Sequence, residues 1–150
     1  MKKHFMKKFF VCFMLFFGSI NSFFAESIVR KAINKDIIKN NYSVICREEN
    51  VTLVSDKNGK FFIYWEGYNF AAFYEEFEKI EKSYVALILR DFPSSVWKIQ
   101  SKGYTIFYFK NSNYYNGVFY VRTPKDNFYS LTEKTNRQII PDDDSIIDNF

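Results

Sequence analysis

Histidine and cysteine are scarce in this 150-residue chain, which contains one His and two Cys. His4 and Cys12 both lie in the first 25 residues, a segment that the sequence predicts to be removed, so Cys46 alone remains. Without histidine, the processed chain cannot form a Ser-His-Asp or Cys-His catalytic site, and it lacks the imidazole ligands of most catalytic zinc sites. One thiol cannot close an intrachain disulfide, and its apolar neighbours predict that Cys46 is a buried small hydrophobic residue.

Glycine is also sparse, and the five glycines fall into no phosphate-binding or nucleophile motif. The sequence contains no Gly-x-Gly-x-x-Gly, no Walker loop and no Gly-x-Ser-x-Gly. It therefore predicts no nucleotide or other cofactor and offers no motif that identifies an enzyme family. No internal sequence repeat is detectable either.

The N-terminal 25 residues have the three-part pattern of a secretory signal peptide. Four lysines precede an apolar run, Phe9–Phe17, and small residues follow it. The run is too short for a transmembrane helix, which needs about 20 apolar residues, so we expect export with cleavage after Ser22 or Ala25. Retention of the leader as a membrane tether is the alternative, because Ile20 or Phe23 stands where a small residue is preferred before the cleavage site.

The charge of the chain depends on this leader. The whole chain has 21 Lys and Arg against 17 Asp and Glu, but four of the lysines and none of the acids lie in residues 1–25. The processed chain therefore carries 17 residues of each sign and is neutral. Its composition gives no reason to expect a nucleic acid or an acidic membrane as partner. A membrane is expected as a partner only if the leader is retained.

Residues 26–136 are predicted to form a single α+β domain, of a size that can bury its own core. A helix is predicted over Ser27–Asn40, where Ser27 can act as N-cap and apolar residues recur at helical spacing. A second helix is predicted over Tyr68–Lys82 from the same periodicity. Alternating patterns and short turn signals predict six strands: Tyr42–Arg47, Val51–Ser55, Lys60–Glu66, Val96–Gln100, Tyr104–Lys110 and Val118–Arg122.

The expected fold is a mainly antiparallel sheet of five to seven strands with two principal helices packed on one face. The stretch Tyr84–Arg90 fits either an extension of the second helix or a buried strand, because periodicity cannot decide so short a run. From Pro124 the chain becomes polar. Residues 137–150 are predicted to form a flexible tail that is acidic through Asp142, Asp143, Asp144 and Asp148.

Carboxylates are the remaining candidates for acid–base chemistry once histidine is removed. Glu66, Glu75 and Asp91 are the candidate catalytic carboxylates if the protein is a small periplasmic hydrolase that works through carboxylates. The glutamates of Tyr68–Lys82, however, lie among lysines as on an exposed helix face, where the raised pKa of a general acid is not expected. Residues 56–59 lack the later ligands of a calcium loop and predict a hairpin turn, and we expect no metal site.

Strand alternation suggests one surface of interest. One face would carry Phe107, Phe109, Phe119 and Val121, with Phe61, Ile63 and Trp65 of a neighbouring hairpin, and would pack under the helices. The opposite face would collect Tyr64, Tyr104, Ile106, Tyr108, Tyr120 and Arg122. Tyrosine combines apolar area with a hydroxyl group and is enriched where partners dock. The alternative is that these tyrosines only stabilise a solvent-facing sheet through cross-strand pairs.

These observations predict an exported, non-enzymatic binding or structural domain of the bacterial cell envelope, in the periplasm or outside the cell. Its partner would be a protein or an envelope component, bound through Tyr64, Tyr104, Tyr108, Tyr120 and Arg122. A membrane-tethered accessory protein is the first alternative, and the carboxylate-dependent hydrolase is the second.

Overall fold

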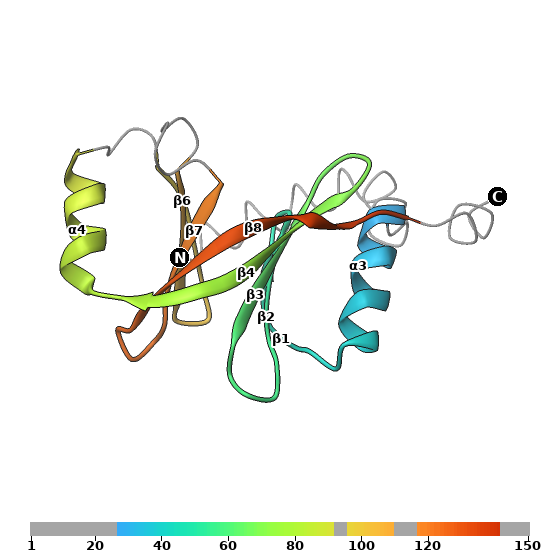
Figure 1. Ribbon diagram of the computed structural model, residues 1–150, viewed down its shortest axis with the longest axis horizontal. Helices are drawn as coiled ribbons and strands as arrows, with labels where there is room; N and C mark the ends of the chain where they lie inside the picture. Colours follow the sequence, from blue (N-terminus) through green and yellow to red (C-terminus); the bar gives the residue numbers. More distant parts are fainter. Residues whose placement is uncertain (1–26, 92–95, 110–116, 142–150) are drawn as a thin grey trace, which may run out of the picture.

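The structure, a computed structural model, describes residues 27–91, 96–109 and 117–141. The predicted leader and residues 142–150 of the predicted tail lie outside the described residues. Along the chain (Figure 1) the elements are α3 (Ile28–Lys39), β1 (Ser43–Glu48), β2 (Val51–Ser55), β3 (Phe61–Glu66), β4 (Ala71–Ile80), α4 (Lys82–Asp91), β5 (Val96–Ser101), β6 (Tyr104–Phe109), β7 (Val118–Arg122) and β8 (Phe128–Ile139).

The eight described strands form one antiparallel sheet in the order β1-β2-β3-β4-β8-β7-β6-β5. The sheet curls into a nearly closed barrel, and its edge strands β1 and β5 approach each other. At this edge, Ser101 Oγ donates a hydrogen bond to a carboxylate oxygen of Glu48 at 3.3 Å. Each half of the chain is a helix followed by a four-stranded meander, and the two halves join through β4 and β8. The fold is therefore a structural repeat that the sequence does not reveal.

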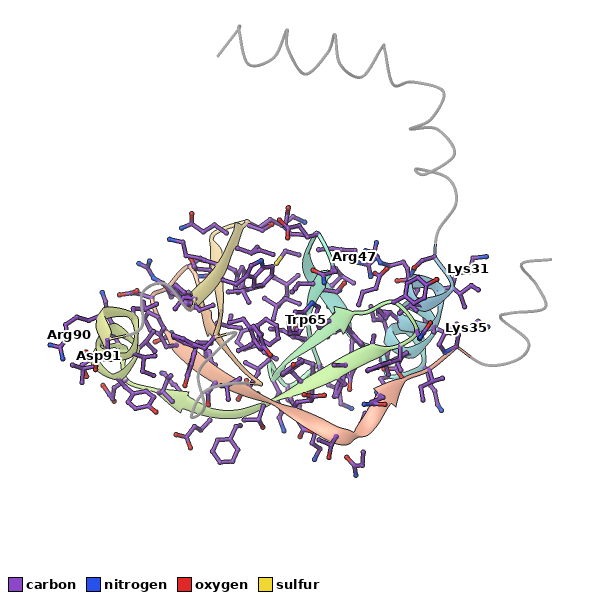
Figure 2. The ribbon with its side chains drawn as sticks, turned by 90° about the horizontal axis from the view of Figure 1, so that it is seen from above. Lys31, Lys35, Arg47, Trp65, Arg90 and Asp91 are labelled. Atoms are coloured by element: carbon purple, nitrogen blue, oxygen red, sulfur yellow. The ribbon has the colours of Figure 1, made fainter. Side chains whose placement is uncertain are left out.

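Aromatic side chains fill much of the barrel interior. The Phe119 ring centroid lies 4.6 Å from the ring centroids of Tyr74 and Tyr108, and Trp65 lies 4.5 Å from Tyr108. Figure 2 shows Trp65 near the middle of the molecule, among side chains from both halves. Aromatic pairs at such distances stabilise a core beyond the effect of their buried area. The other buried members of this interior cluster are Cys46, Val51, Leu53, Phe61, Ile63, Ile99, Ile106, Val121 and Leu131.

The two helices lie outside the barrel, at opposite ends of the sheet (Figure 1). The apolar face of α3 forms one buried cluster with outward side chains of β2, β3, β4 and β8: Val29, Ala32, Ile33, Ile37, Val54, Phe62, Tyr64, Ala71, Phe73 and Ile139. Beneath α4 lies a second outer cluster, which comprises Val85, Ile88, Phe107, Phe109, Tyr120 and Phe128. The sheet is therefore buried on both faces wherever a helix covers it.

Helix α3 begins and ends where the sequence predicts. Ser27 Oγ accepts a hydrogen bond from the Arg30 amide at 2.9 Å, as an N-cap does. At the other end Asn40 is the C-cap, and Asn41 adopts a positive φ of 61° that reverses the chain into β1.

The expected sheet of five to seven strands with two helices on one face is wrong, first because Tyr68–Lys82 is not a helix. Ala71–Ile80 is strand β4 of an eight-stranded sheet, and two short helices accompany it in the described residues. Near α3 both faces of β4 are covered, so an apolar run replaces the alternation of a half-buried strand. A bulge between Glu76 and Glu78 then adds one residue, Phe77, and shifts the pattern. Together these features imitate a helical period.

The second source of error is strand β8, which the sequence did not predict. Its polar residues Lys134, Thr135 and Asn136 are exposed, so most of its second half shows no apolar alternation. β8 nevertheless pairs with both β4 and β7, and it extends three residues into the segment 137–150. The six predicted strands are confirmed within one or two residues, and the undecided Tyr84–Arg90 belongs to helix α4.

Candidate functional site

The predicted tyrosine face does not exist as one surface. Tyr64, Tyr108 and Tyr120 are at most 7% exposed and Tyr104 is partly buried, so Arg122 is the only exposed member of the predicted set. The tyrosines are also divided among three clusters. Tyr64 packs beneath α3, Tyr104 and Tyr108 belong to the barrel interior, and Tyr120 packs beneath α4.

The pairing of β6 with β7 explains this correction. Tyr108 lies opposite Phe119, and Phe107 lies opposite Tyr120. Residues opposite each other share a face, whereas alternation within each strand suggested that Phe107 lies with Phe119 and Tyr108 with Tyr120. A shift of one residue exchanges the two faces of a strand. Because each face is covered, either by a helix or by the barrel interior, both carry large apolar residues and composition cannot distinguish them.

Tyr64 has a structural role in a polar network beneath α3. Its hydroxyl donates a hydrogen bond to Asp36 Oδ2 at 2.5 Å, and Arg137 Nη2 lies 2.6 Å from the same oxygen. The Arg137 guanidinium also lies over the Phe73 ring, 4.4 Å from its centroid. Asp36 therefore connects α3 to β3 and β8, which come from both halves of the chain.

Burial makes the two deepest tyrosines of the described residues resist ionisation. Desolvation and the hydrogen bond to Asp36 raise the pKa of Tyr64 far above its usual value, and desolvation together with nearby Tyr108 and Glu133 raises the pKa of Tyr74. The unfolded chain loses these protons first, near pH 10. The free energy of unfolding is therefore expected to fall as the pH rises above about 10.

This pH dependence can be measured from urea unfolding of the wild-type protein and of Tyr74→Phe between pH 8.5 and 11.5. The difference between the two proteins removes the contribution of groups that titrate in both. The wild-type midpoint should fall more steeply than that of the variant; parallel curves would show that Tyr74 ionises equally in both states.

The three candidate carboxylates of a hydrolase lie on separate elements and in ion pairs. Glu66 Oε1, at the end of β3, lies 2.6 Å from Arg30 Nε. Glu75, on β4, pairs with Lys60 at 2.8 Å, and this hydrogen bond holds the pKa of Glu75 below its usual range. That shift opposes a role as general acid, which needs a raised pKa. Asp91 pairs with the neighbouring Arg90 at the end of α4 (Figure 2).

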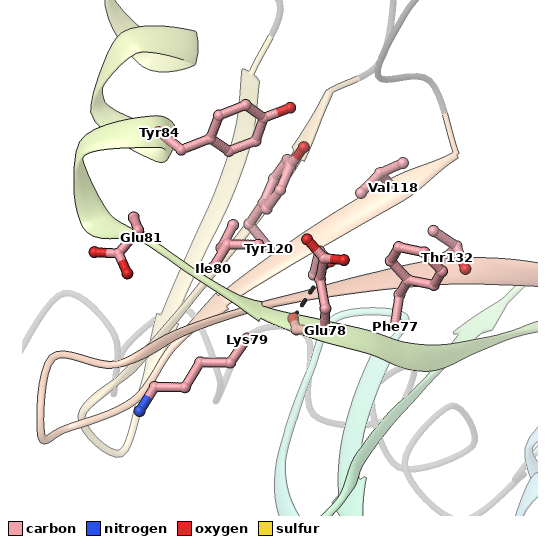
Figure 3. Close-up of a pocket in the computed structure, with 10 residues that line it drawn as sticks. Phe77, Glu78, Lys79, Ile80, Glu81, Tyr84, Val118, Tyr120 and Thr132 are labelled. Carbon is pink, nitrogen blue, oxygen red and sulfur yellow. Dashed lines mark hydrogen bonds between the residues drawn. The ribbon is translucent and has the colours of Figure 1, made fainter.

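A groove on the outer side of the sheet brings exposed aromatic side chains to a concave surface. It lies where β4 leads into α4, has a volume of about 510 Å³, and falls within the usual range for ligand sites. Two aromatic side chains line it while remaining exposed, Phe77 at 69% and Tyr84 at 44%. The other lining residues, shown in Figure 3, are Glu78, Lys79, Ile80, Glu81, Val118, Tyr120, Ser130 and Thr132.

The β4 bulge positions the side chains of this groove. Glu76 lies opposite Leu131 and Glu78 lies opposite Ser130, so Phe77 between them has no partner on β8. Ser130 Oγ also donates a hydrogen bond to the Glu78 carbonyl oxygen at 3.4 Å. Bulges commonly redirect a side chain at a functional position. Tyr120 is the one residue of the predicted binding set that lines the groove. The β4 residues of the groove were missed because the broken alternation at Phe77 resembled a helix, and those of β8 were missed because that strand was not predicted.

Other chemical features of the described residues do not form a site. Cys46 is buried in the barrel interior, as predicted, and burial raises the pKa of its thiol. No cluster of three or more His, Cys, Asp or Glu suited to a metal ion occurs within residues 27–91, 96–109 and 117–141. In the same ranges no helix has the length and apolarity required to cross a bilayer.

No protein-family model matches this chain, and comparisons with curated proteins and with solved structures likewise give no match.

Proposed function

We propose that this chain is a non-enzymatic binding domain whose partner docks in the groove between β4, α4, β7 and β8. The observation that supports this proposal is the exposure of Phe77 and Tyr84 beside a concave surface with an apolar floor. Exposed aromatic residues around a hollow are typical of interaction sites, because they supply large apolar area with few rotatable bonds. The proposed partner is a protein of the envelope or the extracellular space.

The location of the protein is part of the same proposal. The lysine-rich start and short apolar run of residues 1–25 support export through a cleaved leader. Mass spectrometry of the native N-terminus tests this directly. A start at Phe23 or Glu26 is expected for a released domain, whereas an intact leader on membrane-associated protein would favour a tethered accessory protein.

The groove can be tested with a photo-crosslinking amino acid placed at position 77. The matched control is position 68, since Tyr68 is 95% exposed and lies in the turn between β3 and β4, outside the groove. A partner that is captured from position 77 and not from position 68 is then purified. Its affinity is measured by calorimetry for the wild-type protein, Phe77→Ser and Tyr68→Ser.

We expect Phe77→Ser to weaken binding by about 30-fold, the effect of losing a central aromatic contact. Tyr68→Ser should leave the affinity unchanged. Because Phe77 is mostly exposed, its replacement should change the free energy of unfolding by no more than about 0.5 kcal/mol. Equal affinities of all three proteins would overturn the assignment of the groove.

A further inference from the structure

The groove combines aromatic side chains with the carboxylate of Glu78. Glu78 forms no salt bridge within the described residues, in contrast to Glu66 and Glu75, which are both paired. Figure 3 shows the Glu78 side chain rising toward the groove, while the Lys79 side chain points away from it. Strand alternation explains this difference, because Glu78 and Lys79 lie opposite Ser130 and Tyr129, which project from different faces of β8.

The charge near the groove is negative as a consequence. Glu81 stands at the same end, where β4 leads into α4, and it too forms no ion pair with another described residue. The nearby Lys82 is paired with Asp126 at 2.9 Å and Arg122 with the same aspartate at 2.7 Å. Glu78 and Glu81 therefore line the groove together with one basic residue, Lys79, whose ammonium group points away from it, while Lys82 and Arg122 are paired with Asp126.

Aromatic faces and a carboxylate together favour one kind of ligand. The faces of tyrosine and phenylalanine rings carry negative electrostatic potential and attract cations within about 6 Å. A carboxylate at the rim adds a charge-assisted hydrogen bond to a guanidinium or ammonium group. The apolar floor, with Ile80 and Val118, fits the methylene stem of a long basic side chain.

We propose that the groove binds an arginine or lysine side chain presented by an apolar segment of the partner protein, with Glu78 as its counter-ion and Phe77, Tyr84 and Tyr120 around it. This inference rests on the proposed function, since it names the chemistry that the same groove recognises. Glu81, whose carboxylate points outward in Figure 3, contributes long-range attraction rather than direct contact.

The test uses three blocked tripeptides that differ only in their central residue: leucyl-arginyl-leucine amide, its uncharged citrulline analogue and its norleucine analogue. Each peptide is titrated into ¹⁵N-labelled protein, and amide shifts are followed at Tyr84, Val118, Tyr120 and Thr132. The arginine peptide is expected to bind about tenfold more tightly than the citrulline peptide, and less tightly as salt is added.

Charge-neutral variants provide the second part of the test. Glu78→Gln should weaken binding of the arginine peptide about fivefold, and Glu81→Gln should weaken it less. The matched control is Glu49→Gln, which removes the same charge from an exposed position in the β1–β2 turn, remote in sequence from the groove residues. Its affinity should equal that of the wild-type protein.

The outcomes separate this inference from the proposed function. If the norleucine or citrulline peptide shifts the groove amides as strongly as the arginine peptide, the groove binds apolar segments and the cation is not recognised. If Glu78→Gln and Glu49→Gln bind the arginine peptide equally, Glu78 is not its counter-ion. If no peptide shifts the groove amides and crosslinking at position 77 also yields no specific partner, both proposals are wrong.

Discussion

Replacing Phe119 by alanine should lower the free energy of unfolding by about 3–5 kcal/mol, as expected for a large aromatic side chain removed from a core. Phe119 is fully buried, and its ring lies within 6.4 Å of four other aromatic rings: those of Trp65, Tyr74, Trp97 and Tyr108. The loss would be a large part of the 5–15 kcal/mol that stabilises a typical domain. Urea unfolding followed by tryptophan fluorescence provides the measurement, since Trp65 and Trp97 report on the same cluster.

Phe77 supplies a control of the same residue type. It is 69% exposed, so Phe77→Ala should change the free energy of unfolding by no more than about 0.5 kcal/mol.

Tyr108→Ala distinguishes the observed pairing from the one that alternation suggested. It should destabilise the protein strongly because Tyr108 is an interior residue; a Tyr108→Ala protein as stable as wild type would place that side chain on the surface.

Removing the carboxylate of Asp36 should destabilise the protein by about 2–4 kcal/mol, because the substitution breaks a largely buried ion pair and a hydrogen bond together. The Asp36 side chain is 14% exposed and the Arg137 side chain is 34% exposed. Once Asp36 is replaced, water can therefore hydrate part of the unpaired guanidinium group of Arg137. Asp36→Ala leaves the Tyr64 hydroxyl without its acceptor at a site with 0% exposure. The effect is measured by urea unfolding at pH 7.

Asp91→Ala is the matched control for Asp36→Ala, since the Arg90–Asp91 pair is more than half exposed on both sides. Its effect should stay below about 1 kcal/mol. A double-mutant cycle of Asp36→Ala with Arg137→Ala isolates the pair itself, and we expect a coupling of about 1–3 kcal/mol. Additive effects of the two substitutions would show that Asp36 and Arg137 act independently.

Local signals in the sequence account for the parts of the fold that were predicted correctly. The Ser27 cap and the apolar stripe of α3 involve residues within four positions of each other, as do the tight turns at Gly59 and Gly103, where φ is 86° and 84°. Such signals need no knowledge of the partner element. For this reason the boundaries of α3 and of the first hairpins agree with the structure to within one or two residues.

The features that were predicted wrongly depend on contacts between distant segments. Whether Ala71–Ile80 reads as helix or strand depends on its burial on both faces, by α3 outside the barrel and by the barrel interior. Its bulge is defined by the pairing with β8, which is distant in sequence. The faces of β6 and β7 depend on their register, in which Tyr108 lies opposite Phe119 and Phe107 lies opposite Tyr120. The groove combines β4, α4, β7 and β8, so no single stretch of sequence carries its pattern.

The burial of the predicted tyrosine face and the exposure of the groove aromatics are tested most directly by hydroxyl-radical footprinting of the folded protein, read residue by residue with mass spectrometry. The structure predicts rapid labelling of Tyr68, Phe77 and Tyr84, and slow labelling of Tyr64, Tyr74, Tyr108 and Tyr120. Rapid labelling of Tyr64, Tyr108 and Tyr120 would contradict the fold described above, because all three side chains are buried in it.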